Sequence, residues 1–337
     1  MRSRYIGSIQ PNSGELDPMK RALICGVSGQ DGSYLAQLLL SKGYEVFGAS
    51  RDAQVSSFAN LEFMGIRNSV GLISVAVNDF RSVFQAISKI RPDEIYNLAG
   101  QSSVGLSFEQ PVETMESVSI ATLNLLEAIR FAGTSIKLYN AGSSECFGSS
   151  GEFPCNEDTP FRPRSPYAVA KAAAFWQVAN YREAYDLFAC TGILFNHESP
   201  LRPARFVTKK IVSAVARIVR GSDEKLLLGN LAISRDWGWA PEYVEAMWMM
   251  LQQDRPEDFV IATGHSYTLE AFVELAFAEA GLNWRDHIRL DRDLFRPTDL
   301  EHSNAAPDKA HNILGWRARS DMIDVVKNMI AIELGNV

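Results

Sequence analysis

Short apolar runs alternate with segments of helical periodicity through the first 195 residues of the chain. An apolar run bounded by turn residues predicts a strand, and apolar positions that recur every three or four residues predict a helix. We expect strands at 21–25, 44–49, 71–77, 94–98, 136–140 and 188–194, and helices at 31–42, 80–90, 113–131 and 165–185. Strands that alternate with helices indicate right-handed crossovers, and therefore a Rossmann-like α/β fold with a doubly wound parallel sheet.

This rhythm loosens after about residue 196. Short strands are expected at 226–228 and 259–261, among helices at 207–220, 241–252, 269–280 and 322–332. We interpret residues 19–195 as an NAD(P)-binding Rossmann domain. Residues 196–337 are interpreted mainly as a smaller mixed α/β substrate-binding lobe, with some segments returning to the Rossmann domain. Residues 1–18 lack the apolar core of a signal peptide and are interpreted as an N-terminal extension.

Composition narrows the class of protein. The net charge of −7 and the isoelectric point near 5.4 argue against a general nucleic-acid or anionic-membrane partner. An anionic small molecule remains possible, because its site needs only a few arginines and a helix N-terminus. The four cysteines form no CxxC pair, which indicates reduced thiols in a cytoplasmic protein and no metal site.

A glycine-rich segment follows the first expected strand and opens the first expected helix. Gly26, Gly29 and Gly32 have the GxxGxxG spacing of a turn that binds the diphosphate of a dinucleotide, with Gln30 and Asp31 between them. The free N–H groups and the positive dipole end of the helix favour an anion at this point. We expect these five residues to bind a nicotinamide cofactor.

Residues after the next two strands bear on which cofactor binds. The guanidinium of Arg51 can pair with a 2′-phosphate, which favours NADP, whereas Asp52 leaves NAD open. Asp79 follows the third strand and can accept a hydrogen bond from the adenine amino group. The same carboxylate can equally cap the helix that begins at Phe80.

A second group of residues can carry out acid–base chemistry. Tyr167 and Lys171 lie four residues apart on an expected helix and therefore on one face, where the ammonium can lower the pKa of the phenol. Ser143 can hydrogen-bond the substrate oxygen that is oxidised. Glu145 is the residue that distinguishes between possible reactions. A nucleotide-sugar 4,6-dehydratase needs a carboxylate that removes the proton from C5 of the sugar and protonates the departing C6 hydroxyl. A 4-keto reductase or an epimerase of the same fold does not need this acid.

Several longer stretches then carry a resemblance to a known family. They are Gly26–Leu35, Tyr96–Ser102, Phe161–Tyr167, Gly192–Pro200, Phe206–Thr208, Arg235–Gly238, Tyr243–Trp248 and Phe295–Thr298. From about residue 19 to about residue 316 the chain resembles the GDP-mannose 4,6-dehydratases, which are extended short-chain dehydrogenase/reductases. The resemblance implies a hydro-lyase of deoxysugar biosynthesis that converts GDP-mannose to GDP-4-keto-6-deoxymannose by internal hydride transfer through bound NADP.

The resemblance also implies roles for individual residues. The catalytic group would be Ser143, Glu145, Tyr167 and Lys171. Further cofactor contacts would be Leu98, Ala99, Gln101, His197 and Arg202. The GDP-sugar would contact Asn196, Lys210, Arg235, Arg296 and Glu301.

Some positions depart from the family pattern. Asp52 stands where the family has a second arginine, Ser234 where it has lysine, and His302 opens a stretch that the family keeps apolar. These changes leave open a dehydratase of another GDP-hexose or GDP-heptose. A homodimer or homotetramer is expected. A dinucleotide-binding redox sensor of the same fold is disfavoured, because such regulators commonly lose the tyrosine or the lysine.

Overall fold

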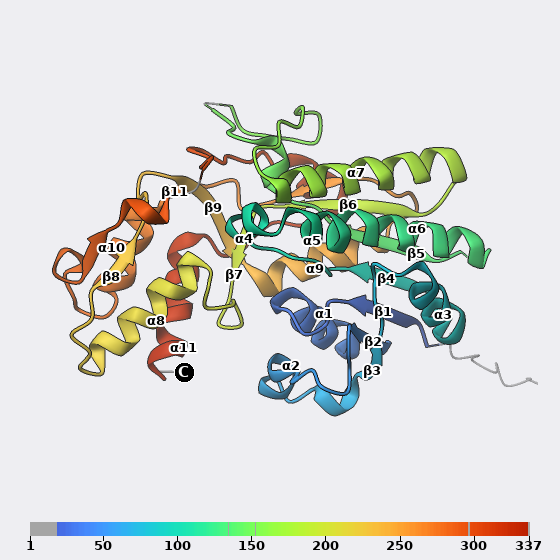
Figure 1. Ribbon diagram of the computed structural model, residues 1–337, viewed down its shortest axis with the longest axis horizontal. Coiled ribbons are helices and arrows are strands. Elements are labelled where there is room, and N and C mark those ends of the chain that lie inside the picture. The colour runs from blue at the N-terminus through green and yellow to red at the C-terminus, as the bar shows by residue number, and fades with distance from the viewer. Residues whose placement is uncertain (1–18, 134, 152, 296, 336–337) are drawn as a thin grey trace, which may run out of the picture.

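A seven-stranded parallel sheet forms the centre of the molecule. The computed structural model describes residues 19–335 except 134, 152 and 296, so the expected N-terminal extension lies outside the described residues. The strand order is β10-β6-β5-β4-β1-β2-β3, and all neighbours are parallel (Figure 1). The strands are β1 (Arg21–Cys25), β2 (Glu45–Ser50), β3 (Gly71–Ser74), β4 (Glu94–Asn97), β5 (Lys137–Ala141), β6 (Ala189–Leu194) and β10 (Phe259–Ile261). The predicted Rossmann-like fold is confirmed.

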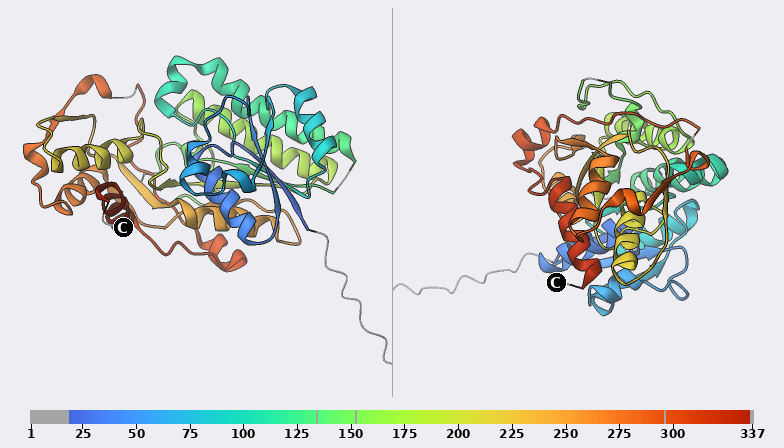
Figure 2. Two further views of the ribbon diagram at one scale, coloured as in Figure 1. Left: turned by 90° about the horizontal axis from the view of Figure 1, so that it is seen from below. Right: turned by 90° about the vertical axis from the view of Figure 1, so that its left-hand side faces the viewer.

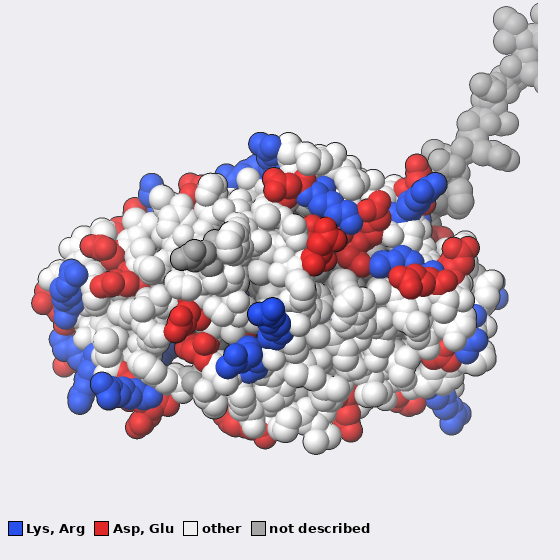
Figure 3. All heavy atoms as spheres, turned by 90° about the horizontal axis from the view of Figure 1, so that it is seen from above, with Lys and Arg blue, Asp and Glu red and all other residues white. Residues whose placement is uncertain are grey.

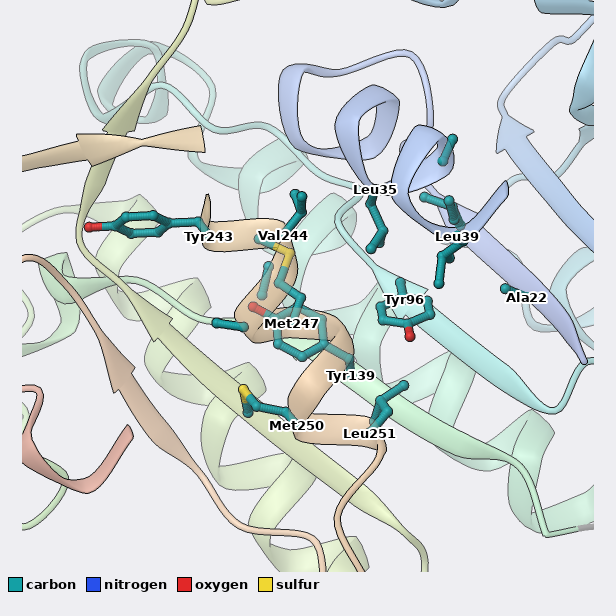
Figure 4. Close-up of a cluster of buried hydrophobic side chains, with 14 of the residues drawn as sticks. Ala22, Leu35, Leu39, Tyr96, Tyr139, Tyr243, Val244, Met247, Met250 and Leu251 are labelled. Carbon is teal, nitrogen blue, oxygen red and sulfur yellow. The ribbon is translucent and has the colours of Figure 1, made fainter. Parts of the chain in front are cut away.

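Helices cover both faces of this sheet. Helices α1 (Gln30–Ser41) and α9 (Ala240–Leu251) pack together on one face, and α3 (Phe80–Ile90), α6 (Ala121–Ala132) and α7 (Pro166–Tyr185) cover the other. Figure 4 shows the side chains of Leu35 and Leu39 from α1 and of Met247 from α9 directed towards Tyr96 and Tyr139 of the sheet. This core places the start of α1 above the point between β1 and β4 where the strand order reverses, which is where doubly wound folds bind ligands.

A smaller lobe lies beyond the carboxyl ends of the central strands (Figures 1 and 2). Its elements are β7 (Asn196–Glu198), α8 (Val207–Val219), β8 (Leu226–Leu228), β9 (Ser234–Trp239), β11 (Ser266–Thr268), α10 (Leu269–Ala278), β12 (Ile288–Leu290) and α11 (Met322–Leu334). Strands β11-β9-β7 form one sheet and β12-β8 another. A separate core around Trp237, Phe272 and Phe277 fills the lobe. Only Phe195 separates β6 from β7, so the chain passes directly from the central sheet into the lobe.

The structure differs from the expected elements in a few places. Strand 259–261 pairs with β6 at the edge of the central sheet, because its three residues are all buried. The expected helix 113–131 comprises α5 (Pro111–Met115), a π-helical turn η2 (Glu116–Ile120) and α6. The remaining short elements are α2 (Ala59–Phe63), η1 (Arg67–Ser69), α4 (Val104–Glu109), η3 (Ser144–Phe147), η4 (Trp284–Asp286), η5 (Arg292–Leu294) and η6 (Ala310–Leu314). They are too short for a hydrophobic period to identify.

Charged side chains of both signs are interspersed over the face shown in Figure 3, as expected for a chain of moderate net charge. Among the described helices, none is long and apolar enough to span a bilayer.

Two glycines are required by close backbone approach where β1 meets α1. Gly26 has φ +90°, and a Cβ there would lie 2.8 Å from the carbonyl oxygen of Leu98. A Cβ on Gly32 would lie 2.3 Å from the carbonyl oxygen of Gly26. These contacts explain the outer glycines of the GxxGxxG spacing, since any side chain would force α1 away from β1.

We therefore expect Gly32→Ala to lower the free energy of unfolding by about 1–3 kcal/mol through overpacking. The measurement is denaturant unfolding followed by circular dichroism. Gly105→Ala is the matched control, because the nearest atom to a Cβ at this position in α4 is 4.0 Å away. If Gly32→Ala is as stable as this control, the close packing of α1 on β1 does not hold.

Candidate active site

The central sheet and the lobe enclose a cleft of about 270 Å³ at the carboxyl ends of β4, β5 and β6. It brings together many of the residues singled out in the sequence: Asp31, Leu98, Ser143, Glu145, Tyr167, Lys171, Asn196, His197, Arg202 and Arg235. A second hollow of about 530 Å³ lies against β2, β3 and α3 and contains none of the expected site residues. The chemistry therefore belongs to the cleft between the two parts of the molecule.

The four side chains that were expected to be catalytic lie together in the cleft. Tyr167 and Lys171 lie one turn apart on α7, and both are buried. The Nζ of Lys171 donates a hydrogen bond to the carbonyl oxygen of Ala141 (2.7 Å) and lies 5.8 Å from the centre of the Tyr167 ring. Ser143 and Glu145 follow β5, and the Ser143 hydroxyl accepts a hydrogen bond from the Glu145 backbone N–H (3.3 Å). The end of β5 thus supplies the hydroxyl, the acid and the carbonyl that anchors the lysine.

Burial dominates the electrostatics of this pair. It raises the pKa of Tyr167, and the hydrogen bond with the Ser143 hydroxyl only partly opposes that effect. Burial also lowers the pKa of Lys171 to about 8. The expected lowering of the phenol pKa is therefore not seen in the protein alone. The reason is that a low-dielectric site disfavours the charged form of both groups. The phenol therefore needs a further charged or hydrogen-bonding partner to ionise, whereas Lys171, with a pKa of about 8, is still mostly protonated at neutral pH.

The glycine-rich turn suits a dinucleotide diphosphate. Helix α1 begins after Gly29 without a side chain hydrogen-bonded to its first N–H groups, which leaves these groups able to bind an anion. Gly26 and Gly32 have no room for a Cβ, so the turn stays tight and open to a ligand. These features fit the cofactor expected from the sequence.

The two residues inside the glycine-rich segment connect it to the lobe. The Gln30 amide is buried, donates to the His197 carbonyl oxygen (3.1 Å) and accepts from the Ser199 hydroxyl (2.8 Å). One carboxylate oxygen of Asp31 lies 2.9 Å from Nε2 of His197. Gln30 and Asp31 therefore hold the start of α1 against β7, in addition to any contact with a cofactor.

The Asp31–His197 pair shifts both pKa values. Burial favours the neutral carboxyl of Asp31, but the His197 ring outweighs it and lowers the pKa of Asp31 to about 2. Burial would likewise lower the pKa of His197, but the Asp31 carboxylate raises it above its ordinary value. The pair is thus an ion pair over a range of acidic to neutral pH.

Residues expected at the adenosine end lie where the sequence placed them. Arg51 is exposed just after β2. The carboxylate of Asp52 accepts a hydrogen bond from the Gln54 N–H (2.9 Å) and so closes a local turn. Asp79 caps α3 by accepting from the Arg81 N–H (3.0 Å), which confirms the capping role considered for it.

The loop after β4 carries three of the expected cofactor contacts. Leu98 lines the cleft and Ala99 follows it. The Gln101 amide donates to the Ser103 carbonyl oxygen (2.8 Å) and to the Thr114 hydroxyl (3.2 Å), so its side chain shapes this loop.

The expected substrate residues divide into two groups. Asn196 and Arg235 line the cleft, and the Arg235 guanidinium donates to the Leu300 carbonyl oxygen (2.8 Å). Lys210 instead donates to the Leu227 carbonyl oxygen (2.7 Å), and Glu301 is exposed; neither lines the cleft. Arg296 lies outside the described residues.

Among the cleft residues that the sequence reasoning did not single out are Glu198 and Thr208. Glu198 is 1% exposed, and one of its oxygens accepts a hydrogen bond from the Thr208 hydroxyl (2.6 Å) and lies 3.1 Å from Nε of Arg202. The signal was present in the stretch Gly192–Pro200, where this acid directly follows the cleft residues Asn196 and His197. Within the described part of the chain no three His, Cys, Asp or Glu side chains are grouped to hold a metal ion.

A doubly wound sheet with a GxxGxxG turn, a YxxxK pair on α7 and a lobe over the strand ends defines an extended short-chain dehydrogenase/reductase. The sequence model of the family described as "GDP-mannose 4,6 dehydratase" matches residues 23–329. "GDP-mannose 4,6 dehydratase 1" of Arabidopsis thaliana is 46% identical, covering 97% of this chain and 93% of its own. The human "GDP-mannose 4,6 dehydratase" is 42% identical, covering 93% and 91%. The chain belongs to the GDP-mannose 4,6-dehydratase family.

Solved structures support the same fold. The UDP-glucose 4-epimerase of Thermus thermophilus in complex with NAD has a TM-score of 0.82 at 26% identity and covers 94% of this chain and 100% of its own. The dTDP-glucose 4,6-dehydratase of Bacillus anthracis in complex with NAD has a TM-score of 0.80 at 20% identity, covering 92% and 95%.

We expect the Asp31–His197 ion pair to give a defined pH dependence of stability. Because the pKa of His197 is raised, its contribution is complete below about pH 6.5 and is lost as the pH rises through the raised value. Because the pKa of Asp31 is lowered to about 2, its contribution is lost as the pH falls from about 4 to 2. Asp31→Asn should therefore cost about 1–3 kcal/mol between about pH 4 and 6.5, and less above that window.

The measurement is denaturant unfolding of the cofactor-free protein across pH 3–9. Asp79→Asn serves as the control, because asparagine caps a helix as well as aspartate. A stability difference for Asp31→Asn that does not change between pH 5 and 9 would contradict the ion pair.

Proposed function

We propose that this protein is a GDP-mannose 4,6-dehydratase that converts GDP-mannose to GDP-4-keto-6-deoxymannose. The observation that carries the proposal is the meeting of Ser143, Glu145, Tyr167 and Lys171 in one cleft beside the glycine-rich turn. Membership of the family, with relatives at 42–46% identity over nearly the full chain, supports it. An epimerase or a 4-keto reductase of this fold would need no acid at the position of Glu145.

We propose a nicotinamide cofactor, with NADP preferred over NAD. Solved relatives of this fold were described in complex with NAD or NADPH. The tight turn at Gly26 and the uncapped start of α1 would hold the diphosphate. Arg51 at the end of β2 would pair with a 2′-phosphate, while the neighbouring Asp52 carboxylate, which closes its own turn, carries a negative charge that works against this preference.

The first step is oxidation at C4 of the sugar. When bound, the nicotinamide accepts the hydride from C4 and later returns it to C6. Tyr167 takes the proton from the C4 hydroxyl, and Ser143 orients that oxygen. Lys171, anchored on the Ala141 carbonyl oxygen, keeps a positive charge one helical turn from the phenol and favours its ionised form when a substrate proton is to be removed.

The second step is the loss of water. A ketone at C4 makes the C5 hydrogen acidic. Glu145 removes this proton and then protonates the departing C6 hydroxyl, so that one carboxylate serves both transfers. A hydride returned to C6 and a proton added at C5 would complete the product. That proton balances the one that Tyr167 took from the C4 hydroxyl, so there is no net oxidation or reduction.

We further propose that the enzyme is a cytoplasmic homodimer or homotetramer. Large apolar side chains are exposed on adjacent helical segments on one face of the central sheet: Val112, Ile120, Val169 and Trp176. A patch of this kind is typical of a surface that a second subunit covers.

The proposal is tested by incubating the purified protein with GDP-mannose and NADP and following the sugar nucleotide by mass spectrometry. We expect the loss of one water from the sugar nucleotide without accumulation of NADPH, and slower turnover with NAD. Water loss only from another GDP-hexose or GDP-heptose would overturn the substrate assignment and keep the mechanism. No water loss from any of them would overturn the proposed reaction.

We expect Glu145→Gln to lower the dehydration rate by about 10²–10⁴-fold, because the amide can neither accept the C5 proton nor donate one to the leaving hydroxyl. Oxidation at C4 should persist and be visible as NADPH absorbance in a single turnover. Glu274→Gln, on the exposed surface of α10, is the control and should be as active as the parent. Dehydration at the parent rate would sink the role of Glu145.

A further inference from the structure

One buried acid of the cleft has no part in the proposed chemistry. Glu198 is the last residue of β7, and β7 is held in register by its pairing with β9, where Glu198 stands opposite Trp239. A fully buried carboxylate is costly unless it is paired and hydrogen-bonded. Glu198 has both kinds of partner, a hydroxyl from the first turn of α8 and a guanidinium from the loop between them.

The guanidinium belongs to Arg202, and the structure fixes it from two sides. Its Nε lies 3.1 Å from the Glu198 carboxylate, as an ion pair without the geometry of a hydrogen bond, and its Cζ lies 3.9 Å from the centre of the Phe206 ring. Arginine binds anions through a planar fork. With the Nε side held by Glu198 and one face covered by Phe206, the outer nitrogens of the fork are the part left to meet a ligand in the cleft.

The groups on which the charge of Arg202 acts indicate which ligand it would meet. Its charge acts on Asp31, at the start of α1, and on Tyr167 of α7, and it lowers the pKa of both groups. Arg202, Asp31 and Tyr167 also line the same cleft, so the guanidinium belongs to the region where the cofactor is proposed to bind. Thr208, which fixes the other side of the arrangement, opens the lobe helix α8.

The proposed reaction requires the reduced cofactor to stay bound between the two hydride transfers. The hydride taken from C4 has to stay in the site until water has left, so a cofactor that dissociates in between ends the cycle with free reduced cofactor and an unfinished sugar. A charge held across the cofactor would slow such release.

We propose that Glu198 is a positioning residue that, together with Thr208, holds the Arg202 guanidinium over the cofactor and so retains the cofactor between the two hydride transfers. The inference rests on the proposed function for the identity of the cofactor. Without the carboxylate, the guanidinium can turn away from the site, and the retained contact is lost.

The test measures release of NADPH directly, from the fluorescence of the bound nicotinamide after mixing with excess NADP. We expect Glu198→Gln to raise the dissociation rate constant about tenfold, and Arg202→Gln to raise it at least as much. The double variant should match Arg202→Gln alone, because Glu198 acts through Arg202. A single-turnover assay with GDP-mannose should also show free NADPH with Glu198→Gln and none with the parent protein.

Glu333→Gln is the matched control, since Glu333 pairs with Lys209 of the same helix α8 and does not line the cleft. It should release NADPH at the parent rate. Thr208→Val keeps both charges and removes only the hydroxyl that fixes Glu198. It should release NADPH about threefold faster than the parent protein. It therefore tests the positioning role of Glu198 even if Glu198→Gln fails to fold.

The outcomes separate the inference from the proposed function. A parent protein that binds no NADPH would overturn the proposed function itself. If the parent binds NADPH but Glu198→Gln and Thr208→Val release it at the parent rate, the positioning role is wrong. Additive effects in the double variant would also overturn it, because they would mean that Glu198 does not work through Arg202.

Discussion

The buried contact between the start of α1 and strand β7 is the constraint on which the rest of the site depends. The Asp31–His197 ion pair and the Gln30 amide join the turn expected to hold the diphosphate to the first strand of the lobe. The chain leaves the central sheet at β6 and enters this strand after a single residue. The position of the lobe is therefore set by the same residues that shape the cofactor turn, and the cleft between them has a defined width.

Burial is the main influence on Tyr167 and Lys171, the pair expected to be catalytic. Tyr167 and Lys171 are both buried, and burial shifts each pKa towards the neutral form. The phenol thus resists ionisation in the protein alone, whereas Lys171, with a pKa of about 8, stays mostly protonated at neutral pH. The hydrogen bond with the Ser143 hydroxyl favours the phenolate, and a further cation at the site would do the same.

The sequence predicted the central fold closely, because its strands are short apolar runs and its helices carry a clear period. The catalytic residues could also be placed, since Tyr167 and Lys171 share a helix face and Ser143 and Glu145 end a strand. Partners distant along the chain could not be predicted in this way. The hydrogen bond that the Thr208 hydroxyl donates to Glu198 and the pairing of strand 259–261 with β6 depend on tertiary packing. No local period encodes such contacts.

Two of the departures from the family pattern, Ser234 and His302, lie together in the lobe, whereas Asp52 lies apart from them after β2. Ser234 and His302 are paired by a β-bridge, and the Ser234 N–H donates to the Glu301 carbonyl oxygen (2.7 Å). Both positions flank Arg235, whose guanidinium binds the Leu300 carbonyl oxygen. These two departures therefore lie beside Arg235, a lobe residue of the cleft, while Ser143, Glu145, Tyr167 and Lys171 line the cleft from the side of the central sheet. If the sugar nucleotide contacts Arg235, as the family resemblance implies, changes there would alter which GDP-sugar fits without altering the groups expected to carry out the reaction.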